Sequence, residues 1–121
     1  MCVLFDTGAS RSFIAKNTVH KLQLKQRKLK ELVEVHTPIG GPITLGLYCR
    51  VPISYSFYKF PFDLIVMDFP EFDIILGLDW LTKYEAEVNC GKESLKFERS
   101  LDILRFPVRA RIRIEKNFGQ H

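Results

Sequence analysis

The sequence lacks any uninterrupted apolar run of the roughly 18–20 residues that a transmembrane helix needs. Its most apolar stretch, from Asp63 to Trp80, contains five acidic residues. The first residues, Met-Cys-Val-Leu-Phe-Asp, provide neither the basic segment nor the apolar segment and cleavage site of a secretory signal. We therefore expect a soluble protein of the cytoplasm that has no membrane partner.

Cysteine and histidine are also scarce, with three residues of each type, and they are widely spaced. They form no Cys-x-x-Cys pair and no Cys/His cluster, so the sequence contains no recognisable zinc ligand set. The odd number and wide spacing of the cysteines favour free thiols in a reducing compartment. The sequence therefore predicts neither a metal nor a cofactor. The three cysteines and three histidines are Cys2, Cys49, Cys90, His20, His36 and His121.

The net charge of +4 conceals a strong separation of charge along the chain. The segment from Lys16 to Lys30 contains six Lys or Arg residues and no acidic residue, whereas Asp63 to Glu87 contains seven acidic residues. The chain becomes basic again after Asp102. Basic patches of this size are more often solvated faces than binding sites. No aromatic residue lies within the first patch or within the Arg-x-Arg-x-Arg run of the tail, so nucleic-acid binding through the basic tail is the less favoured alternative.

The 121 residues suit one small domain, and ten Phe, four Tyr and one Trp supply a hydrophobic core. Short alternating segments between turns rich in Gly and Pro are typical of strands and hairpins. The sequence predicts, in order, a strand at Cys2–Phe5, a turn at Asp6–Ser10, a helix from Phe13 to Leu24, a hairpin over Leu32–Ile53 that turns at Pro38–Pro42, paired strands at Ser54–Tyr58 and Phe62–Met67, a loop at Asp68–Phe72, a strand at Asp73–Gly77, a helix capped by Asp79, and a hairpin over Val88–Phe97.

The tail segment Val108–Ile114 alternates apolar residues with arginines at period two, which predicts one continuous strand. Two interpretations of its charged face remain open. An edge strand often carries charges that discourage unwanted pairing. Alternatively, arginines two residues apart on a strand, about 6.6 Å, form a ribbon suited to phosphates.

The strongest functional signal is Asp6-Thr7-Gly8-Ala9-Ser10, directly after a predicted apolar strand. Backbone can approach a carboxylate closely in a glycine turn, and neighbouring hydroxyls can position it. An isolated Asp-Thr-Gly is a weak signal, because it also suits an ordinary Asx turn. A second motif, Ile74-Ile75-Leu76-Gly77 followed by Asp79-Trp80-Leu81, comes some 70 residues later. Together, over Val3 to Phe97, the motifs resemble the retropepsins, the aspartic proteases of retroviruses and LTR retrotransposons, and look most like the gypsy-type branch.

The resemblance implies a mainly β, retropepsin-like (acid protease) fold, closed and barrel-like, with short helices and one lobe per chain. It implies that Asp6 is catalytic and that Thr7 locks two such loops together across a dimer. It also implies that Ile75-Leu76-Gly77 passes behind the catalytic loop and that a glycine-tipped hairpin forms a flap. The catalytic and substrate-binding residues that it implies are Asp6, Thr7, Gly8, Ala9, Ser10, Ile39, Gly40, Gly41 and Ile75.

One Asp-Thr-Gly per chain is not enough for this chemistry. Two carboxylates about 3 Å apart share one proton, so that one activates a water and the other polarises the scissile carbonyl. A chain with one copy must therefore form a symmetric homodimer. The resemblance implies an aspartic endopeptidase that binds and cleaves its own retrotransposon polyprotein. The alternative function is a catalytically silent retropepsin-fold remnant or a domesticated binding module.

The chain departs from the family at both ends. Only five residues precede Asp6, so we expect residues 1–100 to form an N-terminally truncated protease domain and 101–121 a basic C-terminal extension. In such a domain the strand Ile74–Leu76 would lack an outer neighbour, unless the tail strand near Val108 fills that place. We accordingly expect a chain that is mainly monomeric at micromolar concentration and has little or no protease activity.

Overall fold

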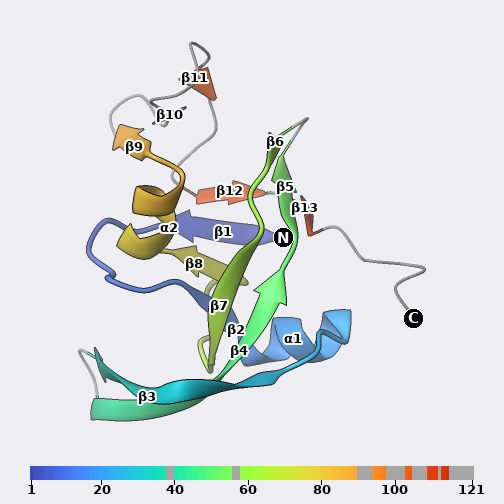
Figure 1. Ribbon diagram of the computed structural model, residues 1–121, viewed down its shortest axis with the longest axis vertical. Helices are drawn as coiled ribbons and strands as arrows, with labels where there is room; N and C mark the ends of the chain where they lie inside the picture. The colour runs from blue at the N-terminus through green and yellow to red at the C-terminus, as the bar shows by residue number, and fades with distance from the viewer. Residues whose placement is uncertain are drawn as a thin grey trace.

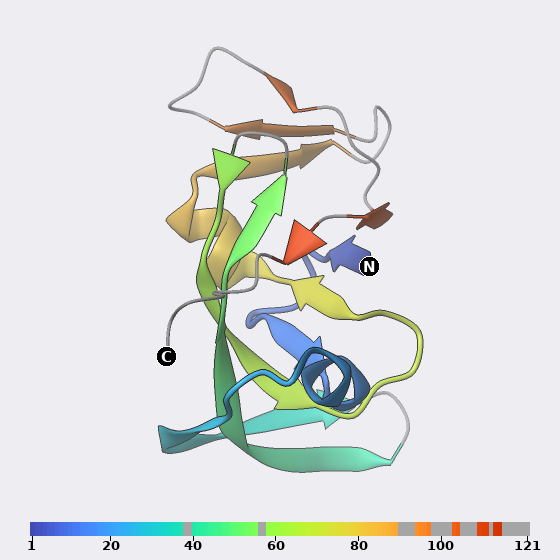
Figure 2. The ribbon, with the colours of Figure 1, turned by 90° about the vertical axis from the view of Figure 1, so that its right-hand side faces the viewer.

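The computed structural model describes residues 1–37, 40–55, 58–89, 94–97, 103–104, 109–111 and 113–114, and these residues are mainly in β-strands. The strands are β1 (Cys2–Phe5), β2 (Phe13–Ala15), β3 (Arg27–Thr37), β4 (Gly41–Val51), β5 (Ile53–Tyr55), β6 (Tyr58–Lys59), β7 (Phe62–Met67), β8 (Ile74–Leu76), β9 (Ala86–Asn89), β10 (Ser94–Phe97), β11 (Ile103–Leu104), β12 (Arg109–Arg111) and β13 (Arg113–Ile114), and the helices are α1 (Lys16–Leu22) and α2 (Leu78–Lys83). Figures 1 and 2 show the β9–β10–β11 sheet at one end of the molecule and the β3–β4 hairpin at the other.

The largest sheet has the strand order β12-β1-β8-β2-β7-β4-β3. Within it β1 pairs parallel with β8, and β8 pairs antiparallel with the central strand β2. The expectation that Ile74–Leu76 lacks an outer neighbour is therefore wrong, because this strand lies between β1 and β2. Among the described strands the two ends of the sheet, β12 and β3, do not pair with each other. The prediction of a mainly β chain is confirmed, but the sheet is open instead of a closed barrel.

The segment Phe13–Ala15 was expected to begin a helix and instead forms β2. All three residues are buried, because β2 lies between β7 and β8 and is covered on both faces. A fully buried strand shows no period-two alternation, so its pattern cannot be distinguished from the start of a buried helix. The helix begins only at Lys16 and ends at Leu22, followed by Gln23 in the left-handed conformation (φ 54°).

The predicted long hairpin is present as β3 and β4, and it starts earlier than expected, at Arg27. Its ladder continues to Thr37 and Gly41, and Pro42 lies opposite His36. Pro42 and Gly41 were expected to remain outside the ladder, so this part of the prediction is wrong. Pro38 and Ile39 lie outside the described residues.

Strand β7 has the predicted bounds but different neighbours, since it pairs with β4 and β2. The segment expected to pair with it forms β5, which pairs with the short β6 instead. Strands β9 and β10 form the predicted final hairpin.

The tail forms two short strands instead of one, and they belong to different sheets. Strand β12 pairs antiparallel with β1, and β13 pairs antiparallel with β5. The tail thus lies beside β1 and not beside Ile74–Leu76, so the alternative expectation, that the tail strand fills the place next to Ile74–Leu76, is wrong as well. Val108 and Ile112 lie outside the described residues.

An aromatic cluster around Trp80 fills the core between α2 and the sheets. Trp80 is 1% exposed and contacts Phe5 and Phe60, with ring centroids 5.7 and 5.4 Å apart. Phe60 in turn stacks on Phe97 at 5.1 Å. Burial of rings of this size supplies much of the stability of a small domain. The cluster fixes α2 directly behind the loop that follows β1.

Candidate active site

The loop between β1 and β2, which we call the Asp6 loop (Asp6–Ser12), places a carboxylate at the end of a buried strand. The Asp6 N–H donates to the Leu76 carbonyl over 2.8 Å, and the Gly8 N–H donates to Asp6 Oδ1 over 2.8 Å. A Cβ at Gly8 would lie 3.2 Å from that oxygen, which explains the glycine. Asp6 is half-buried, and its Oδ2 accepts no hydrogen bond from any residue that the structure describes. One oxygen is therefore held and the other is open.

Gly77, at the end of β8, lies against the backbone of the Asp6 loop. A Cβ at this position would be 2.4 Å from the Arg11 carbonyl oxygen and 2.5 Å from that of Ala9. The next residue continues the contact, because the Leu78 N–H donates to the Ala9 carbonyl over 2.8 Å. No side chain fits between these backbones, so only glycine allows β8 to brace the loop this closely.

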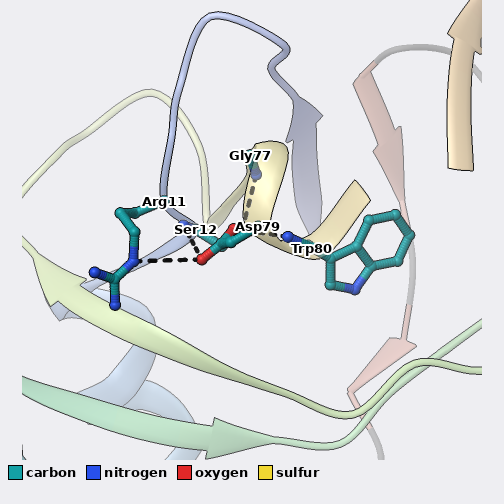
Figure 3. A network of polar contacts seen from close by, with 5 residues as sticks. All are labelled: Arg11, Ser12, Gly77, Asp79 and Trp80. Atoms are coloured by element: carbon teal, nitrogen blue, oxygen red, sulfur yellow. Dashed lines mark hydrogen bonds and ion pairs between the residues drawn. The ribbon is translucent and has the colours of Figure 1, made fainter. Parts of the chain in front are cut away.

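A polar network ties the end of the Asp6 loop to the start of α2 (Figure 3). The hydroxyl of Ser12, a fully buried residue, donates to Asp79 Oδ1 over 2.5 Å and accepts from the Gly77 N–H over 2.9 Å. Asp79 also accepts from the Ser12 and Trp80 N–H groups at 3.2 and 2.7 Å. Arg11 Nε lies 3.5 Å from Asp79 Oδ2. The Asp79 carboxylate thus binds Ser12 of the Asp6 loop and the Trp80 N–H of α2 at the same time, and so joins the loop to the helix.

The prediction that Asp79 is the N-cap of the second helix is wrong. The helix begins one residue before Asp79, at Leu78, and Gly77 occupies the N-cap position. The Asp79 carboxylate reaches across to a segment 67 residues earlier in the sequence. Sequence reasoning missed Ser12 altogether, since a serine between an exposed loop and an apolar strand carries no pattern of its own.

Asp73, just before β8, holds the beginning of β1 in a similar way. Its carboxylate accepts from the Cys2 N–H and from the Thr18 hydroxyl, both over 2.7 Å. Burial raises the pKa of the Asp73 carboxyl, but the hydrogen bonds from Cys2 and Thr18 outweigh burial and hold the pKa below its usual value. Asp73 is therefore a charged structural group that has no contact with the Asp6 loop among the interactions described.

Thr7 is exposed beside the carboxylate and lines an open groove of ≈ 620 Å³ together with α2 and β9. Apart from Thr7, the lining combines the apolar residues Leu78, Leu81, Ala86 and Val88 with the polar residues Thr82, Glu85 and Glu87. Leu78 is 45% exposed, which is unusual for a leucine next to a buried core. This face presents apolar surface next to the candidate catalytic carboxylate.

The other predicted site residues lie in three places. Ala9 and Ser10 belong to the Asp6 loop, and Ile75 lies half-buried in β8 between Leu4 and Phe13. Gly40 and Gly41 lie at the hairpin tip with φ of 92° and 76°, and Ile39 is outside the described residues. The hairpin tip and the Asp6 loop are on the same side of the molecule (Figure 1).

The described residues contain no cluster of three His, Cys, Asp or Glu side chains that could hold a metal ion. None of the helices in the described part of the chain is long and apolar enough to cross a membrane.

Comparison with known proteins identifies the family. The model of the retroviral aspartyl protease family matches residues 1–102. The chain belongs to this family. It is similar to DNA damage-inducible protein 1 of Yarrowia lipolytica, with 28% identity over 91 residues, 75% of this chain and 23% of that protein. Among solved structures it is similar to the retroviral protease-like domain of Ddi1 from Leishmania major, with a TM-score of 0.57 and 20% identity, over 88% of this chain and 80% of that one.

These comparisons confirm the retropepsin-like fold and the membership in an aspartyl protease family. They do not extend to a gypsy-type retrotransposon, because both relatives are Ddi1 proteins. The chain matches about a quarter of the length of its Yarrowia relative, so the activity and partners of that whole protein are not carried over.

Proposed function

We propose that the chain is an aspartic endopeptidase that works as a homodimer, with one Asp6 from each copy. The observation that carries this proposal is the Asp6 carboxylate itself, which is half-buried, held by the Gly8 N–H through one oxygen and open at the other. Asp6 lies at the end of the buried strand β1, in a loop against which Gly77 packs closely. The family membership supports the same chemistry.

Catalysis requires two such loops to meet about a two-fold axis. Two carboxylates about 3 Å apart cannot both ionise, so the pair holds a single proton. The ionised member takes a proton from a bound water, which attacks the scissile carbonyl. The protonated member hydrogen-bonds to the carbonyl oxygen and stabilises the charge that develops there. The pair then titrates as a unit, with two macroscopic pKa values.

The face that carries Thr7 supports the dimer. Thr7 follows Asp6 directly, so a two-fold axis close to Asp6 also brings the two Thr7 side chains close together. The exposed Leu78 and the other apolar residues of the same groove would be covered by the second copy. The dimer therefore completes the dyad and buries apolar surface in one step.

The substrate in this proposal is an extended polypeptide held between the Asp6 loop and the tip of the β3–β4 hairpin, which acts as a flap. We further propose that the natural substrate is the retrotransposon polyprotein from which the chain derives. Among the described residues Cys2 and Cys49 are free thiols, and burial raises the pKa of Cys49 to about 11, so this thiol stays protonated. Free thiols suit a cytoplasmic location, which is part of the proposal.

The test is cleavage of internally quenched peptides with a randomised apolar centre, with and without pepstatin, from mildly acidic to neutral pH. The Asp6→Asn variant is expected to abolish turnover while the thermal unfolding temperature changes little. Asp68→Asn is the matched control, because Asp68 is exposed in the loop after β7 and lies outside the Asp6 loop. Equal turnover of Asp6→Asn and the unchanged chain would refute the assignment.

A folded dimer that binds peptides but cleaves none of them would instead establish the alternative function, a silent remnant or a binding module.

A further inference from the structure

A second groove, of ≈ 590 Å³, runs from the end of the Asp6 loop to strand β3. It is lined by Arg11, by the β3 segment from Lys28 to Val33, and by Tyr48 and Asp63 from the neighbouring strands. The pairing of β3 with β4 shifts its register between Lys28 and Val33, which opens the sheet on this side. Leu29, Val33 and Tyr48 are half-buried, so the lining contains apolar and aromatic side chains beside the charged ones.

Arg11 is oriented within this groove by Asp79. The contact uses the Nε side of the guanidinium, 3.5 Å from Asp79 Oδ2, and the arginine side chain remains 45% exposed. Figure 3 shows the two terminal nitrogens of Arg11 directed away from Asp79. They have no partner among the described residues. A guanidinium held in this way presents a pair of donors suited to a carboxylate.

The charges around Arg11 favour an anion over a cation. Lys28 and Lys30 are exposed and form no ion pair with any residue in the described part of the chain. The lining also contains two acidic residues, Glu31 and Asp63, and Arg50 lies 3.3 Å from Asp63. The lysines and the free face of Arg11 therefore leave the groove with an excess of available positive charge.

The groove is within reach of a peptide whose scissile bond lies at Asp6. Arg11 follows Asp6 by five residues, and five residues of chain span at most about 18 Å. An extended peptide advances about 3.3 Å per residue, so this upper limit corresponds to about five residues, and a side chain within about five residues of the scissile bond can reach the groove.

We propose that Arg11 is a specificity-determining residue that binds a carboxylate side chain of the polypeptide substrate, with Lys28 and Lys30 adding attraction for acidic sequences. This proposal rests on the proposed function for its substrate class. A peptide fits the groove better than a nucleic acid, because the apolar side chains and the two carboxylates in the lining disfavour a phosphate backbone. Asp79, which touches the groove only through Arg11, is the residue that positions it.

The first test measures binding to the Asp6→Asn chain, which does not depend on turnover. Three fluorescent peptide pools share a randomised apolar centre and differ only in their flanks, which are glutamate, glutamine or lysine. We expect the glutamate pool to bind about threefold to tenfold more tightly than the glutamine pool, with a preference that weakens at high salt. Arg11→Gln should remove the preference, and Arg11→Lys should retain part of it.

Lys96→Gln is the control, since Lys96 is an exposed cation on β10 that does not line this groove. It should keep the preference. If Arg11→Gln fails to fold, the double variant Lys28→Gln/Lys30→Gln provides the same test at exposed positions and should reduce the preference. The proposal is overturned if the pools bind equally, if the preference survives Arg11→Gln in a folded chain, or if the preference is undiminished in the double variant. It is also overturned if a single-stranded oligonucleotide displaces the glutamate pool more readily than polyglutamate does.

Cleavage of the same pools by the unchanged chain separates this proposal from the proposed function. Faster cleavage of the glutamate pool, lost in Arg11→Gln, supports both. Absence of cleavage with an intact binding preference refutes the peptidase function and leaves Arg11 as a carboxylate-binding residue. Cleavage without any preference refutes the role of Arg11 alone.

Discussion

The Asp6 loop and the tip of the β3–β4 hairpin lie on the same side of the molecule, but the loop and the hairpin are held in different ways (Figure 1). The loop is braced by β8, by Gly77 and by the Ser12–Asp79 network. The outer part of the hairpin, from Gly41 to Leu47, pairs only with β3 among the described strands. Leu32 of β3 is 70% exposed and Leu47 of β4 is 39% exposed. A two-stranded ribbon of this kind is marginally stable by itself.

This difference matches the two tasks that the proposed reaction sets. A carboxylate that must meet its copy within about 3 Å requires a fixed position, because small displacements of reacting groups cost large factors in rate. A segment that admits and releases a polypeptide has to move on each cycle. Substitutions that disturb the Asp6 loop should therefore cost more stability and activity than substitutions in the β3–β4 hairpin.

The largest expected effect comes from a methyl group placed at the brace. Gly77→Ala puts a Cβ against the carbonyl oxygens of Ala9 and Arg11, and we expect it to cost about 3 kcal/mol or more of stability and to abolish turnover. Gly40→Ala is the matched change in the hairpin. Gly40 has a φ of 92° and a Cβ there would meet open space, so the alanine should cost only the backbone strain of the left-handed conformation, about 1–2 kcal/mol. Urea unfolding measures both, and equal costs would remove the distinction between the two regions.

The next effect comes from the Ser12–Asp79 network. Asp79→Asn replaces one accepting oxygen with a donor, and we expect a loss of about 2 kcal/mol in stability because a buried hydroxyl or N–H then lacks its acceptor. The value of kcat should fall about tenfold or more, with a smaller change in KM, since the loop loses its position. Steady-state kinetics checks this, and an unchanged kcat in the folded variant would show that the network serves stability alone.

Asp73→Asn serves as the companion change, because Asp73 makes comparable hydrogen bonds away from the loop. It should lower stability at neutral pH and leave kcat per folded chain unchanged. The pKa of Asp73 is below its usual value in the folded state, so its contribution is present above the unfolded pKa of about 3.9 and is lost as the pH falls through the folded pKa. Unfolding at about pH 7, pH 5 and pH 2 should show a cost that disappears at the lowest pH, and a constant cost would contradict the assigned charge.

The smallest effect concerns the hairpin without any substitution. Backbone amides of Gly41 and of Val33 to Val35 should exchange with solvent much faster than those of β1 and β8, because their ladder lacks a third strand. A bound peptide inhibitor should slow the hairpin amides and leave the others as they are. Uniformly slow exchange in the free protein would argue against a gating role for the hairpin.

Much of this architecture could be predicted from local patterns. The turn at Asp6, the bounds of β7 and the β9–β10 hairpin follow from alternation and from glycine or polar punctuation. Strand β2 could not be predicted, since a strand buried on both faces has no alternation. The open sheet and the pairing of β12 with β1 depend on contacts between distant segments, which local patterns do not encode.

For the candidate site, the sequence gives Asp6 and the glycine motif through resemblance, but it does not reveal what holds them. Asp79 fits the pattern of a helix cap, and only the fold shows that its carboxylate binds Ser12, a residue 67 positions earlier in the sequence. Arg11 and β3 likewise line one groove because strands distant in sequence bring them together.

The central claim, that one active centre needs two copies of Asp6, is tested most directly by mixing. Unchanged chain and Asp6→Asn chain are combined in varying proportions at constant total concentration, and peptide cleavage is measured after the subunits have exchanged. If only dimers with two Asp6 residues are active, the rate falls with the square of the fraction of unchanged chain. A rate that falls in direct proportion to that fraction would show that each chain acts alone and would contradict the account.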